Sequence, residues 1–220
     1  CIDLWTRYLD ENKDIDVVYL DFSKAFDSVP HMRLIRKLSS IGLQDKVLDW
    51  IQSFLLERRQ RVIVNGAKSS RKMVLSGVPQ ESVLGPILFA LFVNDIPDAV
   101  QNHIQMFADD AKLFSLIASH QDSSRLQQDI DSLQTWTESC GMKFNAEKSK
   151  VLHLGRNNPN YHYFMGNVIE LEAVQKERDL GVMMDNQLNF KEHHETQVKK
   201  ANRILGLIRR SFTNIDTETF

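Results

Sequence analysis

Hydrophobic positions in the first quarter of the chain form one short run and two longer helical stripes, separated by polar residues. Residues 17–20 are apolar and polar residues follow them, which predicts a buried strand. After Pro30, apolar residues recur at helical spacing over residues 31–41, and Gly42 provides a C-terminal cap. The same spacing over residues 47–55 predicts a second amphipathic helix. This part of the chain therefore predicts a strand followed by two helices.

The middle of the chain combines a hairpin pattern with an unusually apolar segment. Asn65-Gly66 separates two extended stretches within residues 61–75, and Asn-Gly is the strongest short signal for a hairpin turn. The Gly- and Pro-containing loop Ser76–Gln80 then leads into the apolar segment. We expect that segment to be a helix that begins near Glu81 and ends near Asn94.

Strands and helices continue to mix in the second half without a strict strand–helix–strand repeat. Two strands are expected within residues 104–117, and a helix is expected next because apolar residues recur at Leu126, Ile130, Leu133 and Trp136. Then come predicted strands, a hairpin and a last helix, at Met142–Phe144, Val151–Leu154, Gly166-Asn167 and from Phe190 onward. This mixture of elements predicts an α+β fold.

Composition narrows the class of protein. Of the 220 residues, 42% are hydrophobic and 25% are charged, which is the balance of a globular domain with a sizeable core. The net charge is −2, so only local clusters of basic residues could indicate a nucleic-acid partner. The longest apolar run, residues 83–93, is shorter than the roughly 18 residues of a membrane helix, so we expect no membrane partner. Because the chain begins at Cys1 rather than at Met, we expect a piece of a longer chain.

Two adjacent carboxylates are the sharpest chemical signal. Asp109 and Asp110 lie between two apolar stretches, and like charges this close raise each other's pKa. A divalent cation would relieve the repulsion, because Mg²⁺ is held by one or two carboxylates together with waters and substrate phosphates. Asp21 follows another predicted strand, and with the pair it could form a two-metal site for phosphoryl transfer. The alternatives are a solvated turn for the pair and a helix N-cap for Asp21.

Two further patterns suit a phosphate-containing ligand. The loop Ser76–Gln80 precedes a predicted helix, whose N-terminus attracts anions, and Gln80 could contact a sugar or a base. Clustered basic residues are the footprint of a protein that binds a nucleic-acid backbone. They are Arg58, Arg59, Arg61, Lys68, Arg71 and Lys72 and, on the last helix, Lys199, Lys200, Arg203, Arg209 and Arg210. The alternatives are an ordinary loop–helix junction and two solvated charged faces.

Taken in order, these residues resemble successive motifs of reverse transcriptases. The resemblance is to non-LTR (LINE-type) retrotransposons of the jockey and chicken-repeat kind, and both the order and the spacing of the motifs agree. The matching segments are Leu20–His31, Ser76–Pro86, Phe107–Asp110, Asn145–Lys148, Leu180–Val182 and Lys200–Asn202.

The resemblance implies a right-hand polymerase palm, which is an antiparallel sheet backed by helices, with partial fingers and the start of a helical thumb. Residues 1–190 would form the palm with partial fingers, and residues 191–220 would begin the thumb. Asp21 and Asp109 would hold two Mg²⁺ ions as catalytic carboxylates, and Asp110 would complete the metal-binding set. Mn²⁺ could replace Mg²⁺ in such a site.

The resemblance also implies roles for the residues around these carboxylates. Phe26 falls at the steric gate that excludes a ribose 2′-hydroxyl, and the substrate site would also include Gly77, Gln80 and Phe107. Lys148 would be a catalytic acid that protonates the pyrophosphate leaving group. Leu180–Val182 would lie in the primer-grip hairpin. The nucleic-acid backbone would contact Arg58, Arg59, Arg61, Lys199, Lys200 and Arg203.

The implied activity is RNA-directed DNA polymerisation, in which a DNA primer 3′-hydroxyl attacks a deoxynucleoside triphosphate (dNTP) paired to an RNA template. The implied locations are a cytoplasmic ribonucleoprotein and the nucleus. Glu81 departs from the family, which has Gly there, and it places bulk and negative charge near the triphosphate, so we expect weakened activity. In a first helical turn, however, Glu81 would simply be favourable to the helix dipole. The alternative function is a catalytically inactive retroelement remnant that at most binds nucleic acid.

Overall fold

A five-stranded sheet lies at the centre of the structure, in the strand order β11-β8-β1-β7-β6. Its middle strand, β1 (Ile15–Asp21), pairs antiparallel with β7 (Asp110–Leu116) on one side and with β8 (Lys150–Leu154) on the other. β6 (His103–Phe107) pairs antiparallel with β7, and β11 (Glu172–Val174) runs parallel to β8. All neighbours in the sheet except β8 and β11 are therefore antiparallel.

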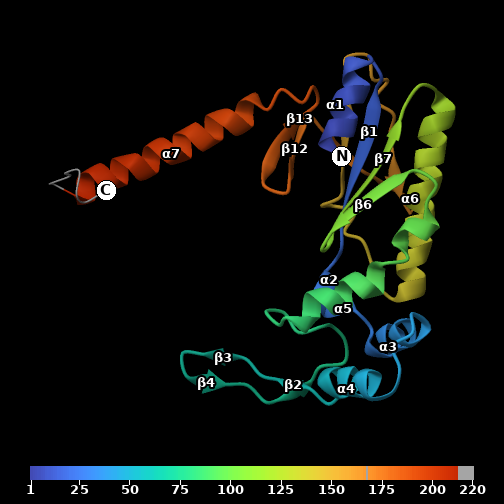
Figure 1. The fold of residues 1–220 in the computed structure, drawn as a ribbon, viewed down its shortest axis with the longest axis vertical. Coiled ribbons are helices and arrows are strands. Elements are labelled where there is room, and N and C mark those ends of the chain that lie inside the picture. The colour runs from blue at the N-terminus through green and yellow to red at the C-terminus, as the bar shows by residue number, and fades with distance from the viewer. Residues whose placement is uncertain (167, 213–220) are drawn as a thin grey trace.

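The computed structural model describes residues 1–166 and 168–212, and its ribbon has the outline of an open C (Figure 1). The sheet forms the back of the C, and helix α7 (Lys191–Ser211) projects from one end. A long hairpin projects from the other end on the same side. Its paired strands are β2 (Arg59–Gln60) with β5 (Lys72–Met73) and β3 (Ile63–Val64) with β4 (Ala67–Lys68).

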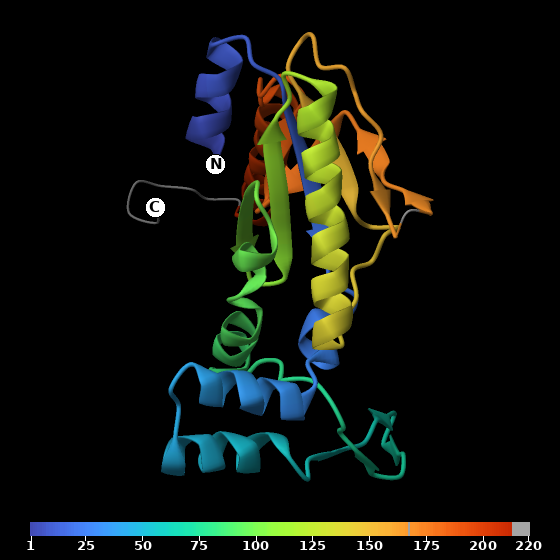
Figure 2. The same ribbon diagram turned by 90° about the vertical axis from the view of Figure 1, so that its right-hand side faces the viewer.

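One face of the sheet is covered by the long helix α6 (His120–Cys140) (Figure 2). Side chains alternate along a strand, so Val18 and Leu20 of β1 lie on this face. They belong to one buried cluster with the α6 residues Leu126, Ile130 and Leu133. These are the apolar positions that predicted the helix, so the same stripe explains both its formation and its docking.

The opposite face of the sheet is covered by α1 (Ile2–Asp10) and by the hairpin of β12 (Lys176–Asp179) and β13 (Val182–Asp185). Trp5 of α1 packs edge-on against Phe114 of β7, with ring centroids 5.5 Å apart. Since both faces are covered, Asp16 of β1 and Lys112 and Ser115 of β7 are buried although they are polar.

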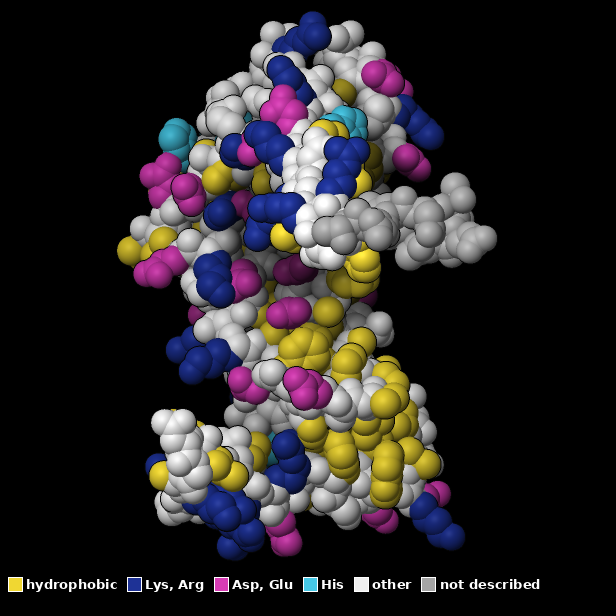
Figure 3. Space-filling model, turned by 90° about the vertical axis from the view of Figure 1, so that its left-hand side faces the viewer, with side chains coloured by type: hydrophobic (Ala, Val, Ile, Leu, Met, Phe, Trp, Pro, Cys, Tyr) yellow, Lys and Arg dark blue, Asp and Glu magenta, His cyan; other side chains and the backbone are white. Residues whose placement is uncertain are grey.

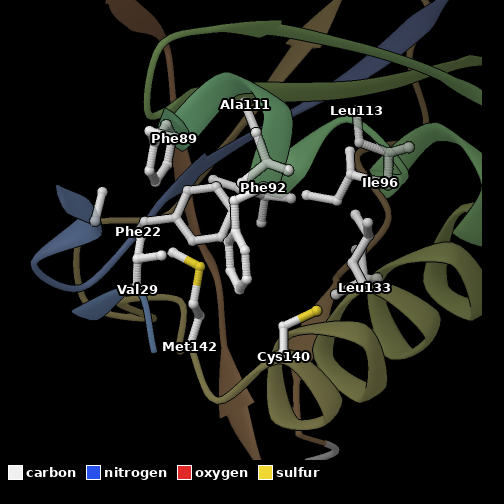
Figure 4. Packing of buried hydrophobic residues seen from close by; sticks show 14 of the residues in the cluster. Phe22, Val29, Phe89, Phe92, Ile96, Ala111, Leu113, Leu133, Cys140 and Met142 are labelled. Atoms are coloured by element: carbon white, nitrogen blue, oxygen red, sulfur yellow. The ribbon is translucent and has the colours of Figure 1, made fainter. Parts of the chain in front are cut away.

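A small helical lobe lies below the sheet and carries the β2–β5 hairpin. It contains α2 (Ala25–Ser28), α3 (His31–Ser40), α4 (Asp45–Leu55), α5 (Leu84–Val93) and the 3₁₀ helix η1 (Ile96–Ala99). The main core continues into this lobe without a break, which fixes the lobe to the sheet (Figure 4). Buried residues at the junction include Phe22, Val29, Phe89, Phe92 and Met142.

The predicted α+β class is confirmed, but one strand and one helix boundary are wrong. Met142–Phe144 does not form a strand, and Phe144 makes only an isolated bridge to Phe22 within the described residues. Helix α5 begins at Leu84 rather than near Glu81. The reason is the backbone of Glu81, whose φ of +58° is incompatible with an α-helix.

The remaining predictions of secondary structure are confirmed within the described residues. The hairpin expected at Gly166-Asn167 consists of β9 (Phe164–Met165) and β10 (Ile169–Glu170), although Asn167 itself lies outside the described residues. The last helix, α7, begins at Lys191 and contains no buried residue. Across the part of the chain that the structure describes, no helix has the length and apolar character needed to cross a membrane.

Candidate active site

Three carboxylates meet at one end of the sheet, where β1 ends and the β6–β7 hairpin turns. Asp21 is the last residue of β1, and it lies opposite Asp110, the first residue of β7, in the antiparallel register. The turn between β6 and β7 is Ala108-Asp109, and Ala108 has a left-handed φ of +54°, as tight hairpin turns require. The fold therefore brings together the three carboxylates that the sequence singled out, and none of them caps α2.

Asp109 and Asp110 border two different cavities, and Asp21 borders both. The first, here called the Phe26 cavity, has a volume of about 540 Å³, within the range of small-molecule sites. Its lining residues are Asp21, Phe22, Lys24, Ala25, Phe26, Gln80, Glu81, Pro86, Asp109 and Lys148. The second, here called the Leu180 cavity, has a volume of about 120 Å³ and lies between Asp21, Asp110 and the β12–β13 hairpin.

The carboxylates repel one another, and one of their oxygens lacks a hydrogen bond. Burial raises the pKa of Asp110 above its ordinary value, and the charges of Asp109 and Asp21 raise it further. Asp21 Oδ2 is buried and accepts no hydrogen bond from any described residue. The Lys148 ammonium lies 3.5 Å from this oxygen, on a side chain that is 67% exposed. A cation bound between the carboxylates would relieve both features.

The set of donors suits Mg²⁺ rather than a metal held by protein side chains alone. Among the described residues, no group of three or more His, Cys, Asp or Glu side chains is placed to hold a metal ion. Mg²⁺ needs only one or two carboxylates, since waters and substrate phosphates complete its coordination. Asp21 and Asp109, which border the same cavity, are sufficient for that kind of site.

Phe26 and Gln80 border the Phe26 cavity from two separate segments of the chain. The Phe26 ring packs on Phe89 of α5, with centroids 4.7 Å apart, so it is supported from behind. Gln80 Nε2 donates a hydrogen bond to Asp27 Oδ1 at 3.0 Å, which ties the loop before α5 to α2. An aromatic wall and an amide therefore stand beside Asp21 and Asp109.

Gly77 supports this loop from behind and does not border the Phe26 cavity. Its φ is +92°, and a Cβ atom would lie 2.8 Å from the Cα of Asp27, so only glycine fits. Its N–H donates to the Val29 carbonyl at 2.8 Å, and its carbonyl accepts a hydrogen bond from His31 Nε2 at 2.8 Å. The position of Gly77 supports a structural role, and its contact with substrate stays a prediction.

Glu81 stands at the edge of the Phe26 cavity on a strained backbone. Its φ of +58° lies in the left-handed region that favours glycine. It precedes the first residue of α5 by three positions, so the alternative of a favourable Glu in the first helical turn is wrong. It also adds a negative charge to a cavity that two carboxylates already border.

The position of Phe107 differs from that of the other predicted substrate residues. It ends β6, its side chain is 62% exposed, and it is not among the residues that line either cavity. Its contact with substrate stays a prediction. Lys24, by contrast, lines the Phe26 cavity and was missed. Its place three residues after Asp21, inside a matching motif, was the available signal.

The two basic clusters lie on the two projecting arms of the C. Lys199, Lys200 and Arg203 are exposed on α7, while the other arm carries Arg59, Arg61, Lys68, Arg71 and Lys72 as exposed residues and Arg58 half-buried. In Figure 3, Lys and Arg side chains gather over both arms, and acidic side chains lie in the waist between them. A polyanion lying across the open side of the C would therefore contact basic residues at both ends.

Asp110→Asn is expected to stabilise the fold at neutral pH. Burial and the charges of Asp109 and Asp21 raise the folded-state pKa of Asp110 above its ordinary 3.8, so charging this group destabilises the folded state. The penalty is complete above the folded-state pKa and disappears as the pH falls below 3.8. Asp110 is exposed, so solvent screens much of this repulsion, and at pH 7 the variant should melt higher by only about one degree. Melting curves at several pH values test this, and a variant that melts lower at pH 7 would contradict the expected repulsion.

Comparison with known proteins agrees with this geometry. The model of the family "Reverse transcriptase (RNA-dependent DNA polymerase)" matches residues 5–208. The RNA-directed DNA polymerase from the mobile element jockey of Drosophila melanogaster is 33% identical over 206 residues, which cover 88% of this chain and 22% of that protein. The Drosophila funebris jockey polymerase is 29% identical over 206 residues, covering 86% of this chain and 22% of that protein.

Solved structures show the same fold. Apo telomerase from Candida tropicalis, truncated from its C-terminal domain, has a TM-score of 0.58 at 15% identity, over 86% of this chain and 38% of that one. Candida albicans telomerase, solved with a fragment of telomeric RNA, has a TM-score of 0.55 at 14% identity, over 84% of this chain and 33% of that one. These likenesses confirm the polymerase palm as the fold. The family match, which spans nearly all of the described residues, shows that the chain belongs to the reverse transcriptase family, with non-LTR retrotransposon polymerases as relatives.

Proposed function

We propose that this chain performs the nucleotidyl-transfer step of an RNA-directed DNA polymerase. The observation that carries the proposal is a shared cavity: Asp21 and Asp109 border it together with Phe26 and Gln80. Its volume of about 540 Å³ suits a nucleotide-sized ligand. The family match and the names of the relatives support the same reaction.

Asp21 and Asp109 would hold two Mg²⁺ ions, Asp110 would complete the set, and Mn²⁺ could replace Mg²⁺. Such ions, when bound, neutralise phosphate charge and lower the pKa of a coordinated hydroxyl. The chain itself contributes position, because a strand end and a tight hairpin turn hold the carboxylates on rigid elements. Phosphoryl transfer needs this positioning and charge neutralisation rather than covalent chemistry by the protein.

The other residues of the cavity would select and activate the reactants. The primer 3′-hydroxyl would attack the α-phosphate of a dNTP, with pyrophosphate as the leaving group. Lys148, exposed at the mouth of the cavity, would donate a proton to that pyrophosphate. The supported ring of Phe26 would clash with a ribose 2′-hydroxyl and so favour deoxynucleotides. Gln80 would contact the nucleotide from the loop that precedes α5.

An RNA template paired with a DNA primer would lie across the open side of the C. Its backbone would meet Arg58, Arg59 and Arg61 on the β2–β5 hairpin and Lys199, Lys200 and Arg203 on α7. Under this proposal residues 1–190 act as the palm with partial fingers, and α7 from Lys191 begins the thumb. The two arms would then hold the duplex while the sheet carries the chemistry.

Primer extension on an oligo(dT)–poly(rA) duplex tests the proposal. We expect incorporation of dTTP that requires Mg²⁺ or Mn²⁺, stops with EDTA and fails to use UTP at comparable rates. Asp109→Ala serves as the blank. Absence of product above that blank, from folded chain and also from its Glu81→Gly form, would refute the catalytic proposal.

Glu81 specifically favours a second candidate, a catalytically inactive remnant that binds nucleic acid through its basic arms. Its charge and strained backbone oppose a triphosphate in the Phe26 cavity, but neither lies on the arms. This candidate predicts RNA or DNA binding that weakens steeply with salt and does not change in Asp109→Ala. Binding measured at several salt concentrations, beside the extension assay, separates the two candidates.

A further inference from the structure

A row of polar side chains crosses the sheet two residues along the strands from Asp21 and Asp110. In the antiparallel register, Lys112 of β7 lies opposite Tyr19 of β1, and Tyr19 lies opposite Lys150 of β8. Lys112 and Tyr19 are each two residues from Asp110 and Asp21, so both pairs lie on the same face. This is the face that the β12–β13 hairpin covers, which places the row between the catalytic carboxylates and the core.

The β12 strand sets two acidic residues over this row. Asp179 accepts hydrogen bonds from Lys112 Nζ at 2.6 and 2.8 Å, and the two side chains are only 7% and 9% exposed. Glu177 lies 3.1 Å from Lys150 Nζ, on side chains that are 20% and 33% exposed. Residues two apart in a strand point the same way, so one strand of the hairpin docks through two ion pairs.

The hydroxyl of Tyr19 shows how closely this contact is packed. It is buried, and no described residue forms a hydrogen bond with it. Burial and the neighbouring charges of Asp179 and Glu177 raise the pKa of Tyr19 above its ordinary 10.0, so it stays neutral at neutral pH. The row therefore carries two positive charges, and the hairpin supplies the two matching negative ones.

A buried ion pair such as Lys112–Asp179 contributes more to the placement of the hairpin than to the stability of the fold. Desolvation of two charges offsets much of their attraction, and well-packed apolar residues in their place are often no less stabilising. Breaking a buried pair nevertheless leaves an uncompensated charge away from water, so the Lys112–Asp179 contact disfavours any other register of the hairpin. The tip of that hairpin, Leu180-Gly181, is thereby held at the Leu180 cavity, which Asp21 and Asp110 border from the sheet side.

We propose that Lys112 and Asp179 are positioning residues that hold the hairpin tip against Asp21 and Asp110 and thereby align the primer end with the carboxylates. This inference rests on the proposed polymerase function. Neither residue lines the Phe26 cavity, where the dNTP is proposed to bind, whereas both line the Leu180 cavity. Under the proposed function, the hairpin at this second cavity contacts the primer, so the pair would affect the place of the primer rather than that of the dNTP. Lys176, paired with Glu192 of α7 at 2.7 Å, continues the connection from the hairpin to the thumb helix.

Steady-state primer extension by Lys112→Met, Asp179→Asn and Lys112→Arg tests the proposal. We expect kcat to fall by about 100-fold in the first two variants, because a displacement of about 1 Å has effects of this size. KM for the primer–template should rise by about tenfold while KM for dTTP stays within about twofold. Lys112→Arg keeps the charge and should recover most of the activity. Lys13→Met is the matched control, because Lys13 belongs to an exposed pair with Glu11 and lines neither the Phe26 cavity nor the Leu180 cavity.

Hydrogen exchange of residues 176–185, measured without substrates, separates this inference from the proposed function. If neither the unchanged chain nor its Glu81→Gly form makes product, the polymerase proposal fails, and faster exchange in Lys112→Met and Asp179→Asn still supports the hairpin-holding role of the ion pair. Unchanged exchange in a folded variant would overturn it, as would equal effects on the two KM values. Asp179→Asn preserves shape and carries the test if Lys112→Met does not fold.

Discussion

Asn in place of Asp21 or of Asp109 is expected to lower primer extension by about a thousandfold or more. Each residue contributes a carboxylate to the Phe26 cavity, where the charge of a triphosphate must be neutralised. Neutralisation of this kind is worth several kcal/mol in the transition state, and each 1.36 kcal/mol is tenfold in rate. An amide of the same shape keeps the packing and removes the charge.

Asp110→Asn should lower the rate of primer extension less than either of these changes does, by roughly 10- to 100-fold. Asp110 borders the Leu180 cavity rather than the Phe26 cavity, so it stands farther from the position expected for the dNTP. Asp98→Asn is the matched control, since Asp98 is an exposed acid on η1. Rates should be compared at a temperature at which melting curves show every variant to be folded. A folded Asp21→Asn that extends primers normally would remove the carboxylates from the mechanism.

Glycine in place of Glu81 is expected to raise primer extension by about 10- to 100-fold. A carboxylate at the edge of the Phe26 cavity opposes a triphosphate by roughly 1–3 kcal/mol at the dielectric of a partly solvated site. In addition, a side chain at a φ of +58° costs about 1 kcal/mol, which glycine avoids. The charge repulsion affects the binding of substrate, and the backbone strain affects the shape of the loop that carries Gln80.

Two further variants separate the charge from the strain. Glu81→Gln removes only the charge, so it should recover most of the gain if repulsion dominates. Glu57→Gly is the matched backbone control, because Glu57 is also exposed and has a φ of +59°, but lies outside the lining of the Phe26 cavity. It should relieve similar strain without faster extension. KM for dTTP measured for all three variants decides the matter, and an unchanged KM in Glu81→Gly would exclude the repulsion.

Local patterns were sufficient for most of the secondary structure because each depends on nearby residues. The stripe at Leu126, Ile130 and Leu133 predicts α6, and the same residues bury against the sheet. Asn65-Gly66 predicts the hairpin turn in the same way. The error in the start of helix α5 also has a local cause. Glu81 adopts a left-handed conformation that favours glycine, so a propensity argument places the start of the helix too early.

The sequence by itself determined the α+β class, the reverse transcriptase motifs and the candidate carboxylates Asp21, Asp109 and Asp110. These depend on residue identity and spacing along the chain. Only the tertiary structure decided that Asp109 and Asp110 border different cavities. The motif contains two adjacent Asp residues and does not show which cavity each side chain faces. It alone paired Lys112 with Asp179, since 67 positions separate them along the chain. Contacts of that kind are set by sheet register and burial, which no local pattern contains.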